Sequence, residues 1–230
     1  MVLGCFSFVK AQEIQSKKGE NYLPETGDWA IGFGVNDVFR YLGNTFNGNL
    51  NNNAPNLNYV DDVSFVGKKF ITDKRAIRVS ANLKYSTVNE EIFQLNDVDV
   101  LEKFTIKENT LSVKLGVGKE WRKGKTRLQG FYGSDVFIKL NYEKTFIKKE
   151  GLGEGNIKKS GGGFGINGFI GAEYFIFPKI AIGAQYSYGA EAIYENEKLN
   201  DGVNEIGKGN SKRIGIGGVG ISTINLTLHF

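Results

Sequence analysis

Apolar and polar residues alternate with a period of two along most of the chain after Trp29. The clearest case is Arg75–Tyr85, where every second residue from Ile77 to Tyr85 is apolar and the residues between are polar or charged. Successive side chains of a β-strand point to opposite faces, so this pattern predicts a strand with one apolar and one polar face. The pattern predicts eight strands in all: Trp29–Val35, Phe65–Ile71, Arg75–Tyr85, Thr110–Trp121, Leu128–Tyr142, Phe164–Tyr174, Ile180–Tyr188 and Ile224–Phe230.

The links between these predicted strands alternate between short and long. The short links are 72–74, 122–125 and 176–179, and the long links, rich in Asn, Gly, Lys and Glu, are 42–64, 86–109, 143–160 and 190–212. Outer-membrane barrels join antiparallel strands by short periplasmic turns and longer extracellular loops. The alternation therefore predicts an up-and-down antiparallel barrel, although Lys68-Lys69 leaves open which face of Phe65–Ile71 is polar.

Alternation alone does not show whether the apolar face lies inside, around a ligand cavity as in lipocalins, or outside against lipid. Aromatic residues near the strand ends favour lipid, because such residues form girdles at membrane interfaces. The predicted girdle consists of Trp29, Tyr85, Trp121, Tyr142, Tyr174, Tyr186 and Tyr188.

The polar face carries many glycines and charges of both signs, which suits the narrow interior of a small barrel. We expect these charges to form a network that plugs the lumen, with the members Arg78, Lys84, Lys114, Glu120, Asp135, Lys139 and Glu173. The predicted fold class is thus all-β: an eight-stranded antiparallel up-and-down transmembrane β-barrel with short periplasmic turns and long extracellular loops.

Composition removes most enzyme classes. The chain has one Cys, Cys5, and one His, His229, and no apolar run near the ~18 residues of a membrane helix. A disulfide framework, a cysteine zinc site and most histidine-dependent catalysis are therefore excluded. The net charge of +4 does not indicate a nucleic-acid partner. We predict no enzymatic activity, no cofactor and no metal.

Two other patterns have simpler explanations than ligand binding. Residues 163–168 and 215–220 match GxGxxG, but no helical pattern follows either, so both are predicted to be glycine-rich strands. The acidic pairs Asp61-Asp62 and Glu90-Glu91 are interpreted as solvated loop charge, with a cation site as the alternative.

The N-terminus resembles an export signal. Residues 2–9 are apolar or small, and Val9 and Ala11 fit the −3 and −1 positions of a signal-peptidase site. Because a charged leading region is missing, we interpret 1–11 as the remnant of a signal peptide, 12–28 as a periplasmic N-terminal segment and 29–230 as the barrel. The alternatives are a buried first strand and a lipobox at Leu3-Gly4-Cys5.

Four short motifs carry a family resemblance: Gly27-Asp28-Trp29, the segment 174–180, Gly189 after Tyr186-Ser187-Tyr188, and the terminal segment 226–230. Together with the loop alternation, they resemble the small outer-membrane barrels of the OmpA/OmpX type, particularly those of Bacteroidetes-like bacteria. The resemblance implies a bacterial outer-membrane location and a C-terminal signal for the barrel-assembly machinery, formed by Leu226, Leu228 and Phe230. Gly27-Asp28-Trp29 also matches the GxW of lipocalins.

The expected function is a non-enzymatic structural or interaction role through the extracellular loops, including that of an accessory subunit in a larger outer-membrane complex. Expected partners are outer-membrane lipid and lipopolysaccharide, the barrel-assembly machinery and other outer-membrane proteins. The third long loop is basic, and its lysines are candidates for lipopolysaccharide phosphates: Lys144, Lys148, Lys149, Lys158 and Lys159. The alternatives are a narrow channel for small solutes and a soluble lipocalin-like carrier, and an enzyme built on His229 is the weakest option.

Overall fold

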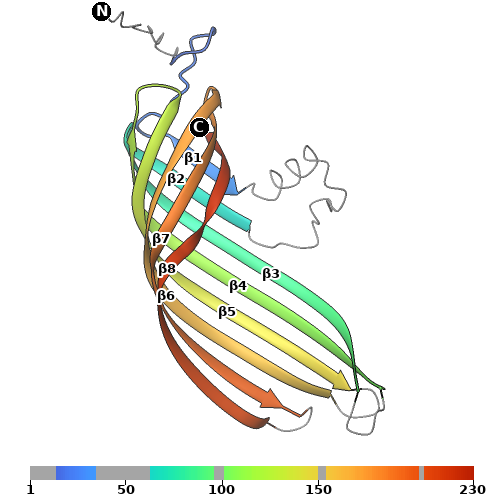
Figure 1. The fold of residues 1–230 in the computed structure, drawn as a ribbon. Helices are drawn as coiled ribbons and strands as arrows, with labels where there is room; N and C mark the ends of the chain where they lie inside the picture. Colours follow the sequence, from blue (N-terminus) through green and yellow to red (C-terminus); the bar gives the residue numbers. More distant parts are fainter. Residues whose placement is uncertain (1–13, 35–62, 96–100, 150–153, 202–204) are drawn as a thin grey trace, which may run out of the picture.

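The computed structural model describes residues 14–34, 63–95, 101–149, 154–201 and 205–230, which form a closed barrel (Figure 1). Each strand is antiparallel to the next along the chain, and the last pairs with the first. The strands are β1 Trp29–Gly34, β2 Val63–Thr72, β3 Arg75–Leu95, β4 Leu101–Lys123, β5 Leu128–Lys149, β6 Glu154–Phe177, β7 Ile180–Asn200 and β8 Glu205–His229. The predicted all-β, antiparallel order of eight strands is confirmed for the described residues.

The short strand β1 closes the barrel. Its Phe33 stands opposite Phe65 of β2 on one side and Leu226 of β8 on the other. Reciprocal backbone hydrogen bonds of 2.7 and 2.9 Å join Trp29 to Phe230 at the end of this closure. The C-terminus and the three short turns lie at the same end of the barrel, which we call the turn end (Figure 1).

The predicted loops 86–109, 143–160 and 190–212 are wrong in extent, because most of their residues are strand. β3 continues to Leu95, and β4 begins six residues later at Leu101. Strands β5–β8 likewise extend beyond their predicted bounds. The backbone of each lengthened strand pairs with its neighbours, so segments with polar residues on both faces still form strands. The predicted loop 42–64 lies outside the described residues up to residue 62.

These additional residues of β3–β8 form a curved sheet below the barrel in Figure 1, which we call the extension. It comprises residues 86–95, 101–109, 143–149, 154–160, 190–200 and 205–212. Glu90-Glu91, predicted to lie in a loop, is therefore part of β3. Alternation places Glu90 on the inner face and Glu91 on the outer face, so the two carboxylates do not converge on one cation.

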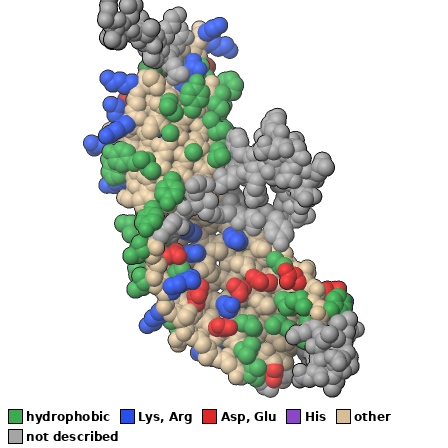
Figure 2. All heavy atoms as spheres, in the orientation of Figure 1, with side chains coloured by type: hydrophobic (Ala, Val, Ile, Leu, Met, Phe, Trp, Pro, Cys, Tyr) green, Lys and Arg blue, Asp and Glu red, His purple; other side chains and the backbone are tan. Residues whose placement is uncertain are grey.

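The apolar face of the barrel points outward. Val79, Val136 and Ile170 are more than half exposed, whereas Arg78, Asp135 and Glu173, which point inward from the same three strands, are buried. Apolar side chains accordingly cover the flank of the upper half of the molecule in Figure 2. This arrangement is the reverse of a lipocalin-like barrel, in which the apolar face would surround an internal ligand.

The glycines of the inner face make room for phenylalanine rings. Three cross-strand pairs between β5 and β6 each place a glycine opposite a ring: Phe131 with Gly171, Gly133 with Phe169, and Phe137 with Gly165. A Cβ added to any of these glycines would lie 2.4 Å from the Cζ atom of the ring. The rings therefore lie across the glycine backbone and fill the lumen, which larger residues at these positions would prevent.

The N-terminal segment covers the turn end. Tyr22 packs against Phe175 and Ala181, both fully buried, and the guanidinium of Arg127 lies 3.7 Å from the centre of the Tyr22 ring. The backbone N–H of Lys179, in the turn between β6 and β7, donates to the Tyr22 carbonyl at 3.2 Å. These contacts fix residues 20–28 against the barrel.

A salt bridge strengthens this attachment. Lys179 Nζ contacts Asp28 Oδ2, and the backbone N–H of Glu25 donates to the same oxygen at 2.8 Å. Partial burial raises the pKa of Asp28, but the hydrogen bonds from Lys179 and Glu25 outweigh burial and hold this pKa below its ordinary value of 3.8.

Candidate functional site

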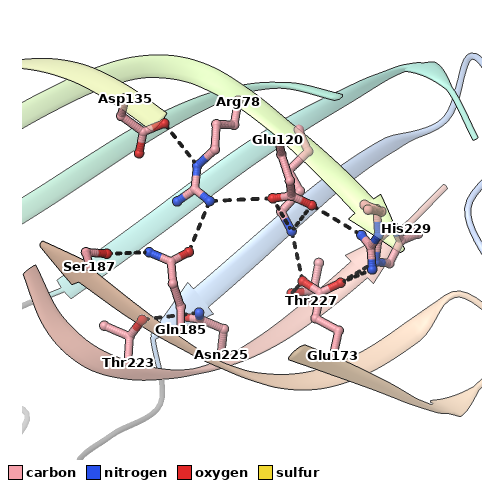
Figure 3. A network of polar contacts seen from close by, with 12 residues as sticks. Arg78, Glu120, Asp135, Glu173, Gln185, Ser187, Thr223, Asn225, Thr227 and His229 are labelled. Carbon is pink, nitrogen blue, oxygen red and sulfur yellow. Dashed lines mark hydrogen bonds and ion pairs between the residues drawn. The ribbon is translucent and has the colours of Figure 1, made fainter. Parts of the chain in front are cut away.

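The lumen near the turn end holds a compact network of charged side chains (Figure 3). Period two directs them inward from five successive strands, and the register brings them together although they are far apart in the sequence. We call this set the lumen charge network: Lys68 of β2, Arg78 of β3, Glu120 and Arg122 of β4, Asp135 of β5 and Glu173 of β6. Each of the six is at most 4% exposed.

Two glutamates form the centre of the network. Lys68 Nζ lies 3.0 Å from Glu120 Oε2 and 2.8 Å from Glu173 Oε1, so it joins the two carboxylates. Arg122 joins them a second time, at 3.4 Å to Glu120 Oε1 and 2.6 Å to Glu173 Oε2. Lys68 and Arg122 thus each contact both carboxylates in the interior, where an unpaired carboxylate would be strongly unfavourable.

Arg78 carries the network across the lumen. Its Nη1 lies 3.5 Å from Glu120 Oε2 and donates to Gln185 Oε1 at 3.0 Å, and its Nε lies 3.4 Å from Asp135 Oδ1. Gln185 Nε2 in turn donates to Ser187 Oγ at 2.9 Å (Figure 3). This chain of contacts reaches across the lumen from β3 to β7.

The network is balanced in charge and rests on aromatic rings. Its three cations match its three carboxylates, so it needs no further ion for neutrality. The guanidinium of Arg78 lies 3.9 Å from the centre of the Phe169 ring, and Lys68 Nζ lies 4.9 Å from that of Phe131. Cations at such distances are attracted to the ring faces. These rings are the ones that the β5 and β6 glycines accommodate.

His229 lies at the edge of the network. Its ring packs between Phe70 and Phe175, with centroid distances of 5.6 and 5.2 Å, and is buried. His229 Nε2 is 3.9 Å from Glu173 Oε2, too far for a hydrogen bond, whereas Thr227 Oγ1 donates to Glu173 at 3.4 Å. The imidazole therefore packs against two aromatic rings and lies near Glu173 without a hydrogen bond to it.

A polar cavity of about 250 Å³ lies beside the network, on the side toward the extension. Arg78 and Asp135 form part of its wall, together with three other predicted lumen charges, Lys84, Lys114 and Lys139. Lys114 and Lys139 are direct cross-strand partners, and Lys114 Nζ lies 3.8 Å from the centre of the Phe137 ring. These three lysines therefore line a positively charged cavity beside the lumen charge network.

Sequence reasoning missed two members of the network. Lys68 stands beside Lys69, and the sequence left the facing of that strand open, whereas the pairing of β2 with β3 turns Lys68 inward opposite Arg78. Lys69 points outward instead and lies 4.5 Å from the centre of the Trp29 ring. Arg122 was assigned to a turn, but β4 continues to Lys123. Arg122 is two residues after Glu120, and this spacing of two was the sequence signal that both side chains point to the same face.

The predicted girdle residues divide into three groups. Trp29, Trp121 and Tyr174 lie close to the turn end, where Trp121 stacks on Tyr132 at 5.9 Å. Tyr85 and Tyr142 are exposed where β3 and β5 pass into the extension. Tyr186 and Tyr188 are exposed too, but they do not lie at a strand end, because β7 continues to Asn200.

The remaining predicted sites lie as follows. Of the residues assigned to barrel assembly, Leu228 and Phe230 are exposed on the outer face and Leu226 is partly exposed on the same face. Both GxGxxG segments lie within strands β6 and β8, with no helix after them. Cys5 and Asp61-Asp62 lie outside the described residues. In the part of the chain that the structure describes, no cluster of three His, Cys, Asp or Glu side chains is arranged to hold a metal.

Comparisons with known proteins give little further guidance. No family model matches the chain, and no curated protein matches it. Among the described residues, no helix has the length and apolar character needed to cross a membrane. The fold is similar to the crystal structure of a major outer membrane protein from Thermus thermophilus, with a TM-score of 0.47 and 9% sequence identity. That match covers 89% of this chain and 100% of the other.

Proposed function

We propose that this chain is a non-enzymatic outer-membrane β-barrel protein with a plugged lumen. Its turn end faces the periplasm, and its extension faces the cell exterior in a structural or interaction role, which includes that of an accessory subunit in a larger outer-membrane complex. Its partners are outer-membrane lipid and lipopolysaccharide, other outer-membrane proteins and, during biogenesis, the barrel-assembly machinery. That machinery reads the outward residues Leu226, Leu228 and Phe230.

The observation that carries this proposal is the combination of an apolar exterior with a charged, filled interior in a closed barrel. Val136, Ile138 and Leu140 alternate along β5 and are 54–59% exposed, while Asp135 and Phe137, which point inward from the same strand, are at most 4% exposed. A row of exposed apolar residues around a barrel is unfavourable in water and favourable in lipid. The pairing of β1 with both β2 and β8 also closes the ring near the turn end, so the strands have no unpaired edge there.

Fractionation followed by gel electrophoresis in SDS, with and without boiling, tests this proposal. We expect the protein in the outer-membrane fraction, with a band that shifts in mobility only after boiling, because a closed barrel resists SDS until it is heated. Recovery in the aqueous fraction without a mobility shift would refute the membrane assignment.

A narrow channel for small solutes is the second candidate, and the polar cavity of about 250 Å³ in the lumen supports it. The lumen charge network opposes it, because three long cations and three carboxylates fill the barrel beside that cavity. We expect planar bilayers with the wild-type protein to show no stepwise conductance. Steady conductance steps that change in size in the Arg78→Ser variant would favour the channel instead.

A further inference from the structure

Four lysines stand in one row across the outer face of the extension. Lys144 of β5 is the direct cross-strand partner of Lys158 of β6, Lys158 is the partner of Lys198 of β7, and Lys198 is the partner of Lys208 of β8. They come from two different hairpins and are spread over 65 residues of sequence, so only the register brings them together. We call them the lysine row.

The lysine row concentrates charge of one sign at one level of the sheet. It continues through Asn109 and Thr87 on β4 and β3, both uncharged. Farther from the barrel, the outer face carries charges of both signs, where Glu91 pairs with Lys103 at 2.8 Å and Glu154 pairs with Lys148 at 3.1 Å. Like charges directly opposite each other on a sheet are unfavourable, and an anion that bridges neighbouring lysines of the row reduces that repulsion.

The inner face of the extension has the opposite character. By alternation it carries the glutamates 90, 108, 143, 191, 195 and 197. Lys159 is an inner-face residue and donates to Glu143 at 3.2 Å. That hydrogen bond and the charges of Glu143 and Glu197 raise the pKa of Lys159. Most glutamates of the extension thus lie on its inner face, with Glu91 and Glu154 as outer-face exceptions, and the lysine row stands on the face that continues the lipid-facing side of the barrel.

The lysine row also marks the level at which the outer face changes from apolar to polar. On β5, Tyr142 is the exposed aromatic residue immediately before Lys144 on this face, and on β7 the exposed Tyr194 precedes Lys198 with one residue of the face between them. Exposed tyrosines occupy membrane interfaces. Beyond such an interface lie the headgroups of the outer leaflet, so the row stands at headgroup level.

An apolar groove of about 770 Å³ lies on the outer surface on the barrel side of this row. Its lining includes Val136, Ile138, Phe164, Ala192 and Ile214. Phe164 is six residues from Lys158 along β6, and Ile214 is six residues from Lys208 along β8, which corresponds to about 20 Å of strand. A cationic row and an apolar groove on the same strands match an anionic headgroup and its acyl chains.

We infer that the lysine row and this groove bind a phosphorylated glycolipid of the outer leaflet, with its phosphates on the lysines and an acyl chain in the groove. The row crosses three inter-strand gaps, or about 14 Å, which exceeds the width of one phosphate and favours a headgroup with more than one. This inference rests on the proposed function, which names lipopolysaccharide as a partner, and deepens it by naming the contact residues and the parts of the lipid that they bind.

Lipid binding to the full-length protein in detergent micelles tests the inference, with diphosphoryl lipid A as the probe and native mass spectrometry as the readout. The test variant is Lys158→Gln/Lys198→Gln/Lys208→Gln. The matched control is Lys17→Gln/Lys18→Gln/Lys125→Gln, which removes three exposed lysines at the turn end. We expect at least tenfold weaker binding in the test variant and less than a twofold change in the control.

Other probes identify which part of the lipid is recognised. Lipid A without phosphates is expected to bind weakly to the wild type, as weakly as diphosphoryl lipid A binds to the test variant. Phosphatidylglycerol is expected to bind to the wild type less tightly than diphosphoryl lipid A does. Equal binding of dephosphorylated lipid A, or equal loss in the control, would overturn the inference. Competition by millimolar inorganic phosphate would also overturn it, by showing a site for free anions.

The heat-modifiable band separates failure of this inference from failure of the proposed function. If wild type and test variant both show the band and bind lipid A equally, the lysine row is not the site, although the barrel stands. If the wild type shows no such band, the membrane barrel itself is refuted. A test variant that lacks the band is replaced by Lys158→Gln/Lys208→Gln, which must then show weaker binding.

Discussion

Replacing Glu120 by glutamine is the sharpest test of the lumen charge network. Glu120 is fully buried and contacts three cations, at 3.0 Å to Lys68, 3.4 Å to Arg122 and 3.5 Å to Arg78. Glutamine keeps the size of the side chain and removes its charge. The six-member network then holds three cations and two carboxylates, and the surplus positive charge is buried.

The magnitude follows from these distances. At an effective dielectric constant of about 20, each of the three contacts contributes about 5 kcal/mol of attraction before desolvation is subtracted. Desolvation and repulsion within the network cancel most of that sum. Removing one partner from a buried ion pair typically costs about 3–5 kcal/mol, because the other charge stays buried without compensation. We therefore expect Glu120→Gln to lower the free energy of unfolding by about 3–5 kcal/mol.

A second variant distinguishes charge balance from packing. Lys68→Met/Glu120→Gln restores equal numbers of cations and carboxylates, and we expect it to recover most of the loss. The assay is urea-induced unfolding of the protein folded into phospholipid vesicles, followed by the fluorescence of Trp29 and Trp121 and by the heat-modifiable band. A single variant within about 1 kcal/mol of wild type, or a double variant less stable than the single one, would refute this reasoning.

Two further substitutions test the packing of the lumen and the attachment of the N-terminal segment. Gly165→Ala places a Cβ 2.4 Å from Phe137 Cζ and 2.4 Å from a backbone carbonyl, so the urea midpoint should fall by the equivalent of about 1–3 kcal/mol. Gly209→Ala is its control, because a Cβ there meets nothing within 4 Å, and equal losses in both would contradict the packing argument. The Asp28–Lys179 pair should stabilise the fold fully above pH 3.8, the ordinary pKa of Asp28, and lose its effect as the pH falls through the lower folded-state pKa. Asp28→Asn should therefore cost up to about 1 kcal/mol at about pH 7, and progressively less as the pH falls below 3.8, in paired urea titrations, and a loss that does not depend on pH would disprove the linkage.

The alternation of residues was sufficient to predict an all-β arrangement of eight antiparallel strands. Alternation along segments such as Arg75–Tyr85 follows directly from the geometry of a strand, whatever the rest of the chain does. It also separated the two faces correctly, because Arg78 and its polar neighbours on β3 lie on the face opposite to Val79 and Leu83. From the sequence, the apolar face was assigned to the outside by argument from the aromatic residues and from the glycines and mixed charges of the polar face. The structure explains the glycines, because phenylalanine rings of the lumen lie across Gly165 and Gly171.

The extent of the strands could not be read from the same pattern. Residues 86–95 and 101–109 carry polar residues on both faces, and such a segment is a strand only when a neighbour pairs with its backbone. The pairing of β3 with β4 continues without a register shift from the pair of Arg75 with Trp121 to the pair of Leu95 with Leu101. The polar composition of these residues therefore predicted a solvated loop, whereas their pairing with each other makes them a β-hairpin.

The sequence by itself determined the strands of the barrel, the polarity of their faces and the residue types available to the lumen, because all three depend on local alternation. The tertiary structure decided which of these residues meet. Lys68 joins Glu120 and Glu173, and Lys144, Lys158, Lys198 and Lys208 form one row. Such meetings depend on the register between strands and on closure of the ring, which are fixed by backbone pairing over the whole barrel and are invisible in any single segment.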